Sequence, residues 1–572
     1  MQILRIALLN NDYLELHFKW QKLRGNSLYM KLDHIHIKLT GLSILTGVLL
    51  TLSWPPIGLF PLIFVGFVPL FFIHHWVIQN KLGSSWAFLY GFISFLIFNL
   101  GTTWWVWNAS AGGAVMAFIL NSLLMNLPFM FLHQLAKKQQ TSLKLWPFIW
   151  AWITFEYFHL RWDGTWPWLT LGNVFANVPW LVQWYEYTGT AGGSLWILWV
   201  NKKLFQWIVS YQTFDKQLRF KGAFNLIFFG FFAPVFLSFY VLGEYKKTTE
   251  NTPAITANIM VVQPNIDPYK EKFGDKAMSD YEQTLKMLNI ADKHMDSTVQ
   301  LIAFPETALV GNLNERDLAN EETIKLIRQF MSKYPTVNII TGVDSYKEYL
   351  QGEKPSKTAR EYNPGQHYDA YNAAYFLQPK SPKIDIYHKS ILVPGVERLP
   401  FAAVLKYVEK YAIDLGGTTG SLGVDEAPHN FTADSMLKAA PIICYESVFG
   451  EYVTEYVKRG ATFLCIITND GWWGNTPGYK QHLQYASLRA IETRRYVARS
   501  ANTGISAFFD DKGNLLQKTN WWEPAALKQN IKLNTVQTFY VKNGDMIGKY
   551  AILFAAYFLF GLIIKRKSPF MP

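Results

Sequence analysis

Three residues in the polar part of the chain could together carry out carbonyl chemistry. Glu306, Lys389 and Cys444 each stand at or near the end of an apolar, strand-like run. A thiolate is a strong nucleophile, a carboxylate can take the proton of the thiol, and an ammonium can stabilise the oxyanion formed by attack on a carbonyl. The set therefore predicts a nucleophilic cysteine with a base and an oxyanion donor.

Each of the three residues also has an ordinary structural interpretation. Cys444 could be a buried thiol, Glu306 a helix-start residue and Lys389 a surface lysine. The surroundings of Cys444 favour the nucleophile, because two isoleucines precede it and Tyr445-Glu446-Ser447 begins a predicted helix. A strand-to-helix elbow exposes its side chain, and a helix N-terminus favours a thiolate. The presence of all three residues together favours the catalytic interpretation over the structural one.

Short apolar runs and longer amphipathic stretches alternate between residues 255 and 541, which is typical of an α/β domain. The runs predict strands at 255–263, 301–304, 337–342, 372–377, 440–444, 463–468 and 504–510. The amphipathic stretches predict helices at 276–295, 321–332, 448–459 and 480–499. Glu306 and Cys444 directly follow strands, where open α/β sheets place reactive groups.

The remainder of the chain has the composition of a membrane protein. Of the 572 residues, half are hydrophobic, 16% are aromatic and only 17% are charged. Segments near the roughly 20 residues that cross a bilayer, several with tryptophan at their ends, predict eight spanning helices. They lie at 35–54, 57–76, 86–105, 112–132, 145–160, 181–200, 224–242 and 546–564.

The basic residues predict the orientation of these helices. They are concentrated before the first predicted span, after the second, fourth and sixth, and after the last, whereas the alternate connections hold only Arg161. Basic loops stay cytoplasmic, so both termini are expected in the cytoplasm and the polar domain outside it. This bias largely explains the net charge of +12, and we expect no nucleic-acid partner. The first 34 residues lack the continuous apolar core of a cleavable signal peptide.

The two cysteines do not suggest a disulfide, and no metal site is predicted. Cys465 lies in an apolar run that resembles a buried strand, where cysteine serves as a small apolar residue. The 12 histidines form no cluster with metal-ligand spacing. We therefore expect neither a metal nor a cofactor.

The motifs around the three reactive residues resemble those of the nitrilase superfamily. Phe304-Pro305-Glu306-Thr307, the lysine of His388-Lys389-Ser390-Ile391-Leu392-Val393-Pro394, and Cys444-Tyr445-Glu446 match its Glu-Lys-Cys triad. The resemblance implies an αββα sandwich with Glu306 as general base and acid, Lys389 as oxyanion stabiliser and Cys444 as nucleophile.

Together with seven spans before the domain and one after it, the chain resembles the apolipoprotein N-acyltransferase family of bacterial membrane enzymes. The resemblance implies acyl transfer from a phospholipid, preferably phosphatidylethanolamine, through a thioester to the α-amine of a diacylglyceryl-modified N-terminal cysteine. It also implies the inner membrane, with a periplasmic catalytic domain. The expected partners are the phospholipid, the diacylated apolipoprotein and the bilayer.

Further residues match the family or its surroundings. Glu397, Tyr445 and Glu446 are expected to support the triad. Trp472 and Trp473 are candidates for a lid over the site. A tryptophan that the family carries after the first strand is absent, and Phe273 is the nearest aromatic substrate-contacting candidate.

The predicted organisation is a cytoplasmic extension (1–34), a seven-helix bundle (35–245), the nitrilase-like domain (255–541), an eighth helix (546–564) and a cytoplasmic tail (565–572). Two alternatives stay open at this point. A membrane-anchored amidase of the nitrilase type would share the triad but would not need the multi-span block. A non-catalytic lipoprotein-binding scaffold would not need the intact triad.

Overall fold

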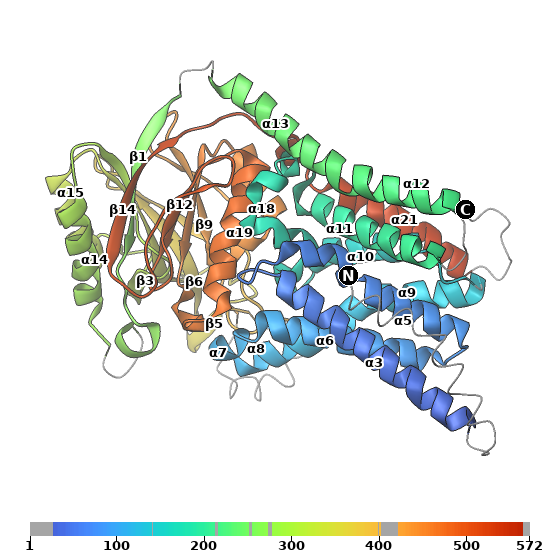
Figure 1. Ribbon diagram of the computed structural model, residues 1–572. Helices are drawn as coiled ribbons and strands as arrows, with labels where there is room; N and C mark the ends of the chain where they lie inside the picture. Colours follow the sequence, from blue (N-terminus) through green and yellow to red (C-terminus); the bar gives the residue numbers. More distant parts are fainter. Residues whose placement is uncertain are drawn as a thin grey trace.

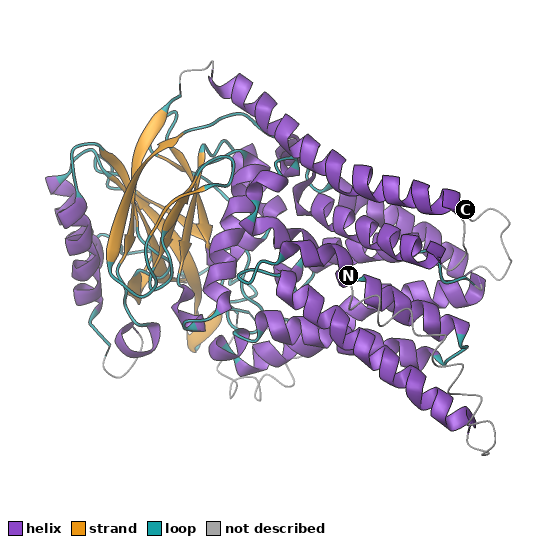
Figure 2. Ribbon diagram, in the orientation of Figure 1, coloured by secondary structure: helices purple, strands orange, loops and turns teal. Residues whose placement is uncertain are grey.

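A computed structural model describes residues 27–563, except residues 140, 212–215, 251–253, 273–276, 399 and 402–420. A helical bundle forms one end of the molecule and a domain of strands and helices the other (Figures 1 and 2). The first long helix, α3, begins at Ser27, so the predicted boundary at residue 34 falls inside it. Residues 1–26 and the predicted tail 565–572 lie outside the described residues.

The bundle is built from long apolar helices joined by short connections. Its main elements are α3 (Ser27–Ser53), α4 (Ile63–Gly66), α5 (Val68–Gln79), α6 (Ser84–Thr103), α7 (Val106–Ala109), α8 (Ala111–Val115), α9 (Asn121–Gln139), α10 (Trp146–His159), α11 (Tyr185–Ser210), α12 (Lys216–Ile227), α13 (Ala233–Glu250) and α21 (Met546–Ile563).

Six helical segments of the described chain are long and apolar enough to cross a membrane: 34–53, 60–79, 84–103, 111–139, 219–248 and 546–563. The predicted spans at 145–160 and 181–200 are not among them. Helix α10 has only 14 residues, and α11 begins with the polar, glycine-containing sequence Tyr-Glu-Tyr-Thr-Gly. Several long apolar helices are therefore observed, with fewer of spanning length than predicted.

The outer surface of the bundle is apolar, as a lipid-facing surface must be. Phe224, Phe228, Phe232, Phe236 and Tyr240 stack on one another at intervals of four residues from α12 through the π-helical segment Phe228–Phe232 to α13, with ring centroids 5.5–6.5 Å apart. Phe236 is 61% exposed. Such a stripe would be unfavourable in water and is stable against hydrocarbon.

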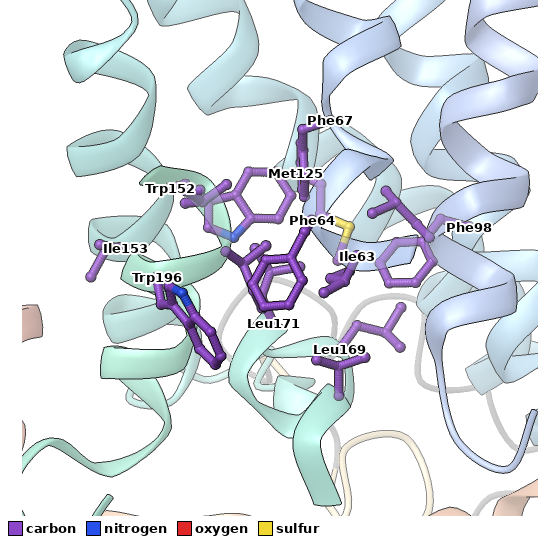
Figure 3. Close-up of a cluster of buried hydrophobic side chains, with 14 of the residues drawn as sticks. Ile63, Phe64, Phe67, Phe98, Met125, Trp152, Ile153, Leu169, Leu171 and Trp196 are labelled. Carbon is purple, nitrogen blue, oxygen red and sulfur yellow. The ribbon is translucent and has the colours of Figure 1, made fainter. Parts of the chain in front are cut away.

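Aromatic side chains fill the inside of the bundle (Figure 3). The ring of Phe64 lies 4.7 Å from that of Trp196, and the ring of Phe67 lies 5.1 Å from that of Trp152. These contacts join α4 and its neighbour Phe67 to α10 and α11. The bundle is thus a packed support for the domain that it carries.

Two sheets form the core of the second domain. The larger has the strand order β14-β1-β2-β4-β6-β5, with β3 beside β4 and β7 beside β6, and the smaller has the order β13-β12-β11-β10-β9-β8. Their bounds are β1 Thr256–Gln263, β2 Val299–Ala303, β3 Leu309–Asn314, β4 Asn338–Glu348, β5 Arg360–Asn363, β6 Gln366–Leu377, β7 Ile384–His388, β8 Phe431–Thr432, β9 Lys438–Ile443, β10 Phe463–Thr468, β11 Val497–Ala501, β12 Ala507–Phe509, β13 Leu515–Lys518 and β14 Ala525–Lys532.

The alternation of side chains along the strands produces the layers. In β1, Ile259 and Val261 join a core shared with β9 and β10 of the other sheet, whereas Met260 and Val262 face α14 (Asp280–His294) and α15 (Glu322–Lys333). Helices α18 (Gly450–Lys458) and α19 (Pro477–Thr493) cover the other sheet (Figure 1). The result is the predicted four-layer sandwich of helix, sheet, sheet and helix.

The predicted helix at 480–499 was wrong at its end. Helix α19 ends at Thr493, where Arg494 adopts a left-handed conformation with φ of 52°, and residues 497–501 form strand β11. The run of alanine, arginine and glutamate has a helical composition that continues past this turn, so local propensity placed the boundary too late.

Helix α19 joins the domain to the bundle. The amide nitrogen of Gln481 donates to the carbonyl of Pro55 (2.7 Å), and its oxygen accepts from the indoles of Trp105 and Trp168. The hydroxyl of Tyr485 accepts from Trp54 and donates to the carbonyl of Trp168. Because the groups involved are buried and paired, these contacts hold the active face of the domain against the bundle.

Candidate active site

Glu306 lies just beyond β2, in a turn that fits closely against β4. The amide of Gly342 donates to the carbonyl of Pro305 (3.0 Å), and a Cβ at Gly342 would lie 2.5 Å from the Cα of Glu306. Glycine is therefore required for this close approach. The Glu306 side chain is 7% exposed, and its Oε2 accepts from the backbone amide of Asn469 (3.0 Å), which follows β10 of the opposite sheet.

Lys389 follows β7 and lies between two carboxylates. Its Nζ is 3.2 Å from Oε1 of Glu306 and 2.8 Å from Oε1 of Glu397, and the side chain is only 1% exposed. The amide of Asn372 donates to the same two carboxylate oxygens, at 2.8 Å each. The four side chains form one buried, hydrogen-bonded network.

The charges in this network stabilise one another. Burial lowers the pKa of Lys389, but Glu397 and Glu306 outweigh it and raise that pKa well above its ordinary value. Burial raises the pKa of Glu306, but the Lys389 ammonium and the hydrogen bonds from Asn372 and Lys389 outweigh it, so this pKa is lowered. The resting site thus holds a carboxylate beside an ammonium.

Cys444 forms the elbow between β9 and a short 3-10 helix, Cys444–Val448. Its φ of 48° lies in the left-handed region, which a residue with a Cβ rarely adopts. The Ser447 hydroxyl donates to the carbonyl of Cys444 (2.7 Å), and Nε2 of His482 lies 3.2 Å from the same oxygen. The expected elbow is present, although the regular helix α18 starts only at Gly450.

The resting nucleophile is a thiol. Burial raises the pKa of Cys444 well above its ordinary value, the Glu306 carboxylate raises it further, and Lys389 only partly opposes them. The thiol also acts as a hydrogen-bond donor that helps to lower the pKa of Glu306. The surroundings of Cys444 therefore favour a thiol beside a ready base over the thiolate expected at a helix N-terminus.

Glu446 supports the site from behind. Its Oε1 accepts from the hydroxyl of Tyr387 (2.6 Å) and the amide of Ser390 (2.8 Å), and its Oε2 accepts from the amide of Ile443 (2.8 Å). It is fully buried. One carboxylate thereby joins the chain on both sides of Lys389 to the residue that precedes Cys444.

Glu397 and Tyr445 connect the site to its surroundings. Oε2 of Glu397 accepts from the amide of Val393 (2.8 Å), which closes the loop after Lys389. The next residue, Arg398, pairs with Asp163 in a connection of the bundle (2.8 Å). The Tyr445 hydroxyl donates to the carbonyl of Thr165 in the same connection (3.0 Å).

Cys444 and Tyr445 lie in the wall of an apolar cavity of about 110 Å³ between the domain and the bundle. Its other walls come from α7 to α9, the connection around Trp166, the loop at Val393–Val396, and Trp473. The Trp473 ring contacts those of Trp105 (4.8 Å) and His482 (5.6 Å). The cavity therefore brings a nucleophile next to apolar residues of the bundle.

The lid candidates have different positions. Trp473 lines the cavity, whereas Trp472 packs against Tyr269 with ring centroids 5.2 Å apart and does not line it. The hydroxyl of Tyr269 donates to the carbonyl of Trp472 (2.9 Å), and the amide of Asn108 donates to that of Trp473 (3.0 Å). Phe273 lies outside the described residues.

Two parts of the site were missed in the sequence. Asn372 was assigned only to a strand, although an asparagine among apolar strand residues is a signal for a buried polar contact. His482 was given no role, yet its Nδ1 lies 3.0 Å from Oδ1 of Asp470, which pairs with Arg499 (2.6 Å). All three are 0–1% exposed, and their spacing along the chain offers no signal that could have found them.

Both cysteines are free thiols, and Cys465 is buried in β10. No group of three or more histidine, cysteine or acidic residues in the described ranges is arranged to hold a metal ion.

The comparisons with known proteins agree with this arrangement. Residues 258–540 match the carbon-nitrogen hydrolase family, and residues 46–202 match the N-terminal domain of apolipoprotein N-acyltransferase. An apolipoprotein N-acyltransferase of Chlorobaculum tepidum is 29% identical over 88% of this chain and 93% of its own. Those of Geobacter metallireducens and Rickettsia prowazekii are 24% and 26% identical, over 92% and 90% of this chain and 95% and 96% of theirs.

These matches cover the bundle and the sandwich domain in their observed order, which a separate amidase domain would not explain. The chain belongs to the apolipoprotein N-acyltransferase family.

Proposed function

We propose that this protein transfers a fatty acyl chain from a phospholipid to the α-amine of the diacylglyceryl-modified N-terminal cysteine of lipoproteins, in two steps through a thioester on Cys444. The observation that carries the proposal is the position of Cys444. It lies in the wall of an apolar cavity bounded by bundle helices, and its thiol is near enough to interact electrostatically with Glu306, whose carboxylate is paired with Lys389.

In the first step Glu306 takes the thiol proton as the sulfur attacks an ester carbonyl of the phospholipid. Lys389 stabilises the negative charge that develops on the carbonyl oxygen. The carbon–oxygen bond breaks, Glu306 returns the proton to the departing lysophospholipid, and the acyl chain stays on the sulfur.

In the second step the lipoprotein amine attacks the thioester. Glu306 takes a proton from the nitrogen, the carbon–sulfur bond breaks, and the proton restores the Cys444 thiol. Glu397 and Asn372 hold Lys389 and Glu306 in place during both steps, and Glu446 holds the elbow.

The site favours a transferase over the two alternatives. An apolar cavity bounded by α7 to α9 suits acyl chains, whereas a small amide substrate would need no such wall. A non-catalytic scaffold would not require Lys389 to be buried between two carboxylates, an arrangement that is costly unless it is used.

We also propose the predicted topology for this protein: eight membrane crossings, cytoplasmic termini and a periplasmic catalytic domain in the inner membrane, with phosphatidylethanolamine as donor. The sandwich domain lies at one end of the bundle, and helix α21, the last described element, runs away from it towards the other end (Figure 1). Helices α10 and α11 would supply the two further crossings, covered by neighbouring helices, because short or polar segments are tolerated where protein surrounds them.

The test is an acyl-transfer assay with purified protein in vesicles of labelled phosphatidylethanolamine and a synthetic diacylated lipopeptide with a free α-amine. The expected product is the triacylated lipopeptide, formed by the wild type and absent with C444A. Release of free fatty acid without transfer would favour a hydrolase, and the absence of any product would favour the scaffold. C465A is the matched control, because Cys465 is buried in β10 away from the cavity, and it should retain transfer.

A further inference from the structure

Two residues that line the cavity beside Cys444 carry buried N–H groups that have no partner. They are Nε2 of His159 and Nε1 of Trp166, and neither has a hydrogen-bond partner among the described residues. His159 is 6% exposed. An unpaired buried donor costs about 1–3 kcal/mol, so a pair of them in one cavity points to a ligand that accepts hydrogen bonds.

The hydrogen bonds of His159 fix which of its nitrogens carries the proton. The indole N–H of Trp162 donates to Nδ1 of His159 (2.9 Å). Nδ1 must therefore hold a lone pair, which makes the imidazole neutral and places its hydrogen on Nε2. The backbone of Trp166 lies beside the ring, but no acceptor there meets the distance and angle of a hydrogen bond to Nε2.

His159 also marks the junction of two apolar spaces. A second, larger hollow of about 640 Å³ lies between α9, α10 and α21, and it shares Leu124 and His159 with the cavity beside Cys444. Its walls include Leu127, Phe158 and Leu559, which are 47–60% exposed on the outer surface of the bundle. The second hollow is therefore open on the side that faces lipid.

A two-chain phospholipid matches this shape and these donors. It has two ester carbonyls a few bonds apart, each an acceptor without a hydrogen to donate, and one long apolar chain beyond each of them. With one chain in the cavity beside Cys444 and the other in the hollow between α9, α10 and α21, the glycerol esters would lie at the junction. The remaining unpaired atom of the cavity, Oδ1 of Asn121, is an acceptor and takes no part in binding an ester.

We propose that the N–H groups of His159 and Trp166 bind the ester carbonyl that Cys444 does not attack, while the chain of that ester occupies the hollow between α9, α10 and α21. The proposal rests on the proposed function and adds the residues that recognise the second acyl ester of the donor. The enzyme thereby distinguishes a diacyl phospholipid from the lysophospholipid that it produces.

The test compares diacyl phosphatidylethanolamine with its two alkyl-acyl analogues, in which an ether replaces one ester and removes one carbonyl. The measurement is kcat/KM for acylation of Cys444. Only the analogue that keeps the ester attacked by Cys444 can acylate it, and this analogue is compared with the diester. Each lost hydrogen bond should lower kcat/KM roughly twofold to tenfold. Because this analogue loses both hydrogen bonds, the wild type should prefer the diester about fourfold to hundredfold over it.

The variants H159F and W166F each remove one N–H and should each reduce this preference, and the double variant should bring the ratio close to one. H159Q retains a donor and should keep part of the preference. W107F is the matched control, because Trp107 is 56% exposed and does not line the cavity, and its ratio should equal that of the wild type. The fraction of protein that becomes acylated reports folding separately from the ratio.

Equal kcat/KM for diester and analogue in the wild type, or an unchanged ratio in both H159F and W166F, would overturn this proposal and leave the proposed function intact. Failure of every donor to acylate wild-type Cys444 would overturn both.

Discussion

Replacing Lys389 by methionine tests the electrostatic basis of the site. Lys389 is buried between Glu306 and Glu397, and its ammonium is 3.2 and 2.8 Å from their oxygens. Loss of an oxyanion donor typically lowers the rate about 10²- to 10³-fold. In K389M the two carboxylates would also face each other across Asn372 without a cation, so one of them should take up a proton.

Because the shared proton reduces the amount of ionised Glu306, the two effects combine, and we expect acylation of Cys444 in K389M to fall by about 10³-fold or more at pH 7. The residual rate should rise between pH 7 and 9 as the carboxylate pair loses the proton. Stability should change in the opposite direction: the folded pKa of the pair is raised above its unfolded value, so K389M should become less stable as the pH rises.

The assay is single-turnover acylation of Cys444 by labelled phosphatidylethanolamine, measured as a function of pH. K458M is the matched control, because Lys458 is partly exposed on α18 and pairs with Glu455 away from the site, and it should acylate like the wild type. Acylation of K389M within tenfold of the wild type at pH 7, or a residual rate that does not depend on pH, would refute the reasoning.

Three further changes have expected outcomes. Burial lowers the pKa of His388, but hydrogen bonds with Asp425 and Glu315 outweigh it and raise the pKa to about 9. Because this folded-state pKa exceeds the unfolded one, the stability that His388 contributes should be complete below about pH 6.5 and lost as the pH rises through 9. The Tm difference between wild type and H388Q should therefore shrink over this range. A Tm difference that stays constant would contradict this prediction. W473A, which opens the cavity wall, should slow Cys444 acylation at least about tenfold, whereas W472A should slow it less. Equal effects of the two variants would show that lining the cavity does not affect the rate of acylation. E446Q places an amide N–H2 against the backbone N–H of Ile443 or Ser390 and should lower the unfolding free energy by about 1–3 kcal/mol. Denaturant unfolding of the purified protein measures this change. Unchanged stability would mean that the Glu446 hydrogen bonds are dispensable.

The fold and the reactive residues could be predicted from the sequence because their signals are local. Strand β10 (Phe463–Thr468) coincides with its predicted range, because a short continuous apolar run in a sandwich domain indicates a fully buried strand. The edge strands β13 and β14 were missed because half of their residues are polar and nearly all are partly or fully exposed. The turn at Arg494, which ends α19, depends on tertiary contacts of its guanidinium with Gln183 and Glu186 in the bundle.

The supporting network could not be derived from the sequence. Asn372 joins Glu306 to Glu397 only because β6 passes beside β4 and β7. The raised pKa of Cys444 follows from the partial burial of its side chain at the elbow and from the nearby Glu306 carboxylate, and neither can be read from the residue types. The two predicted spans that are not among the six long apolar segments, at 145–160 and 181–200, belong to a helix of only 14 residues and to a helix of 26 residues with a polar, kinked start, and neither feature could be read from apolar content.

The mass of the protein after incubation with phosphatidylethanolamine alone, without a lipopeptide, tests the central claim most directly. The account predicts an increase by one acyl chain on the peptide that contains Cys444, its removal by neutral hydroxylamine, and its discharge by a diacylated lipopeptide with a free amine but not by the same lipopeptide with a blocked amine. An unmodified Cys444, or an adduct that the free amine does not discharge, would contradict it.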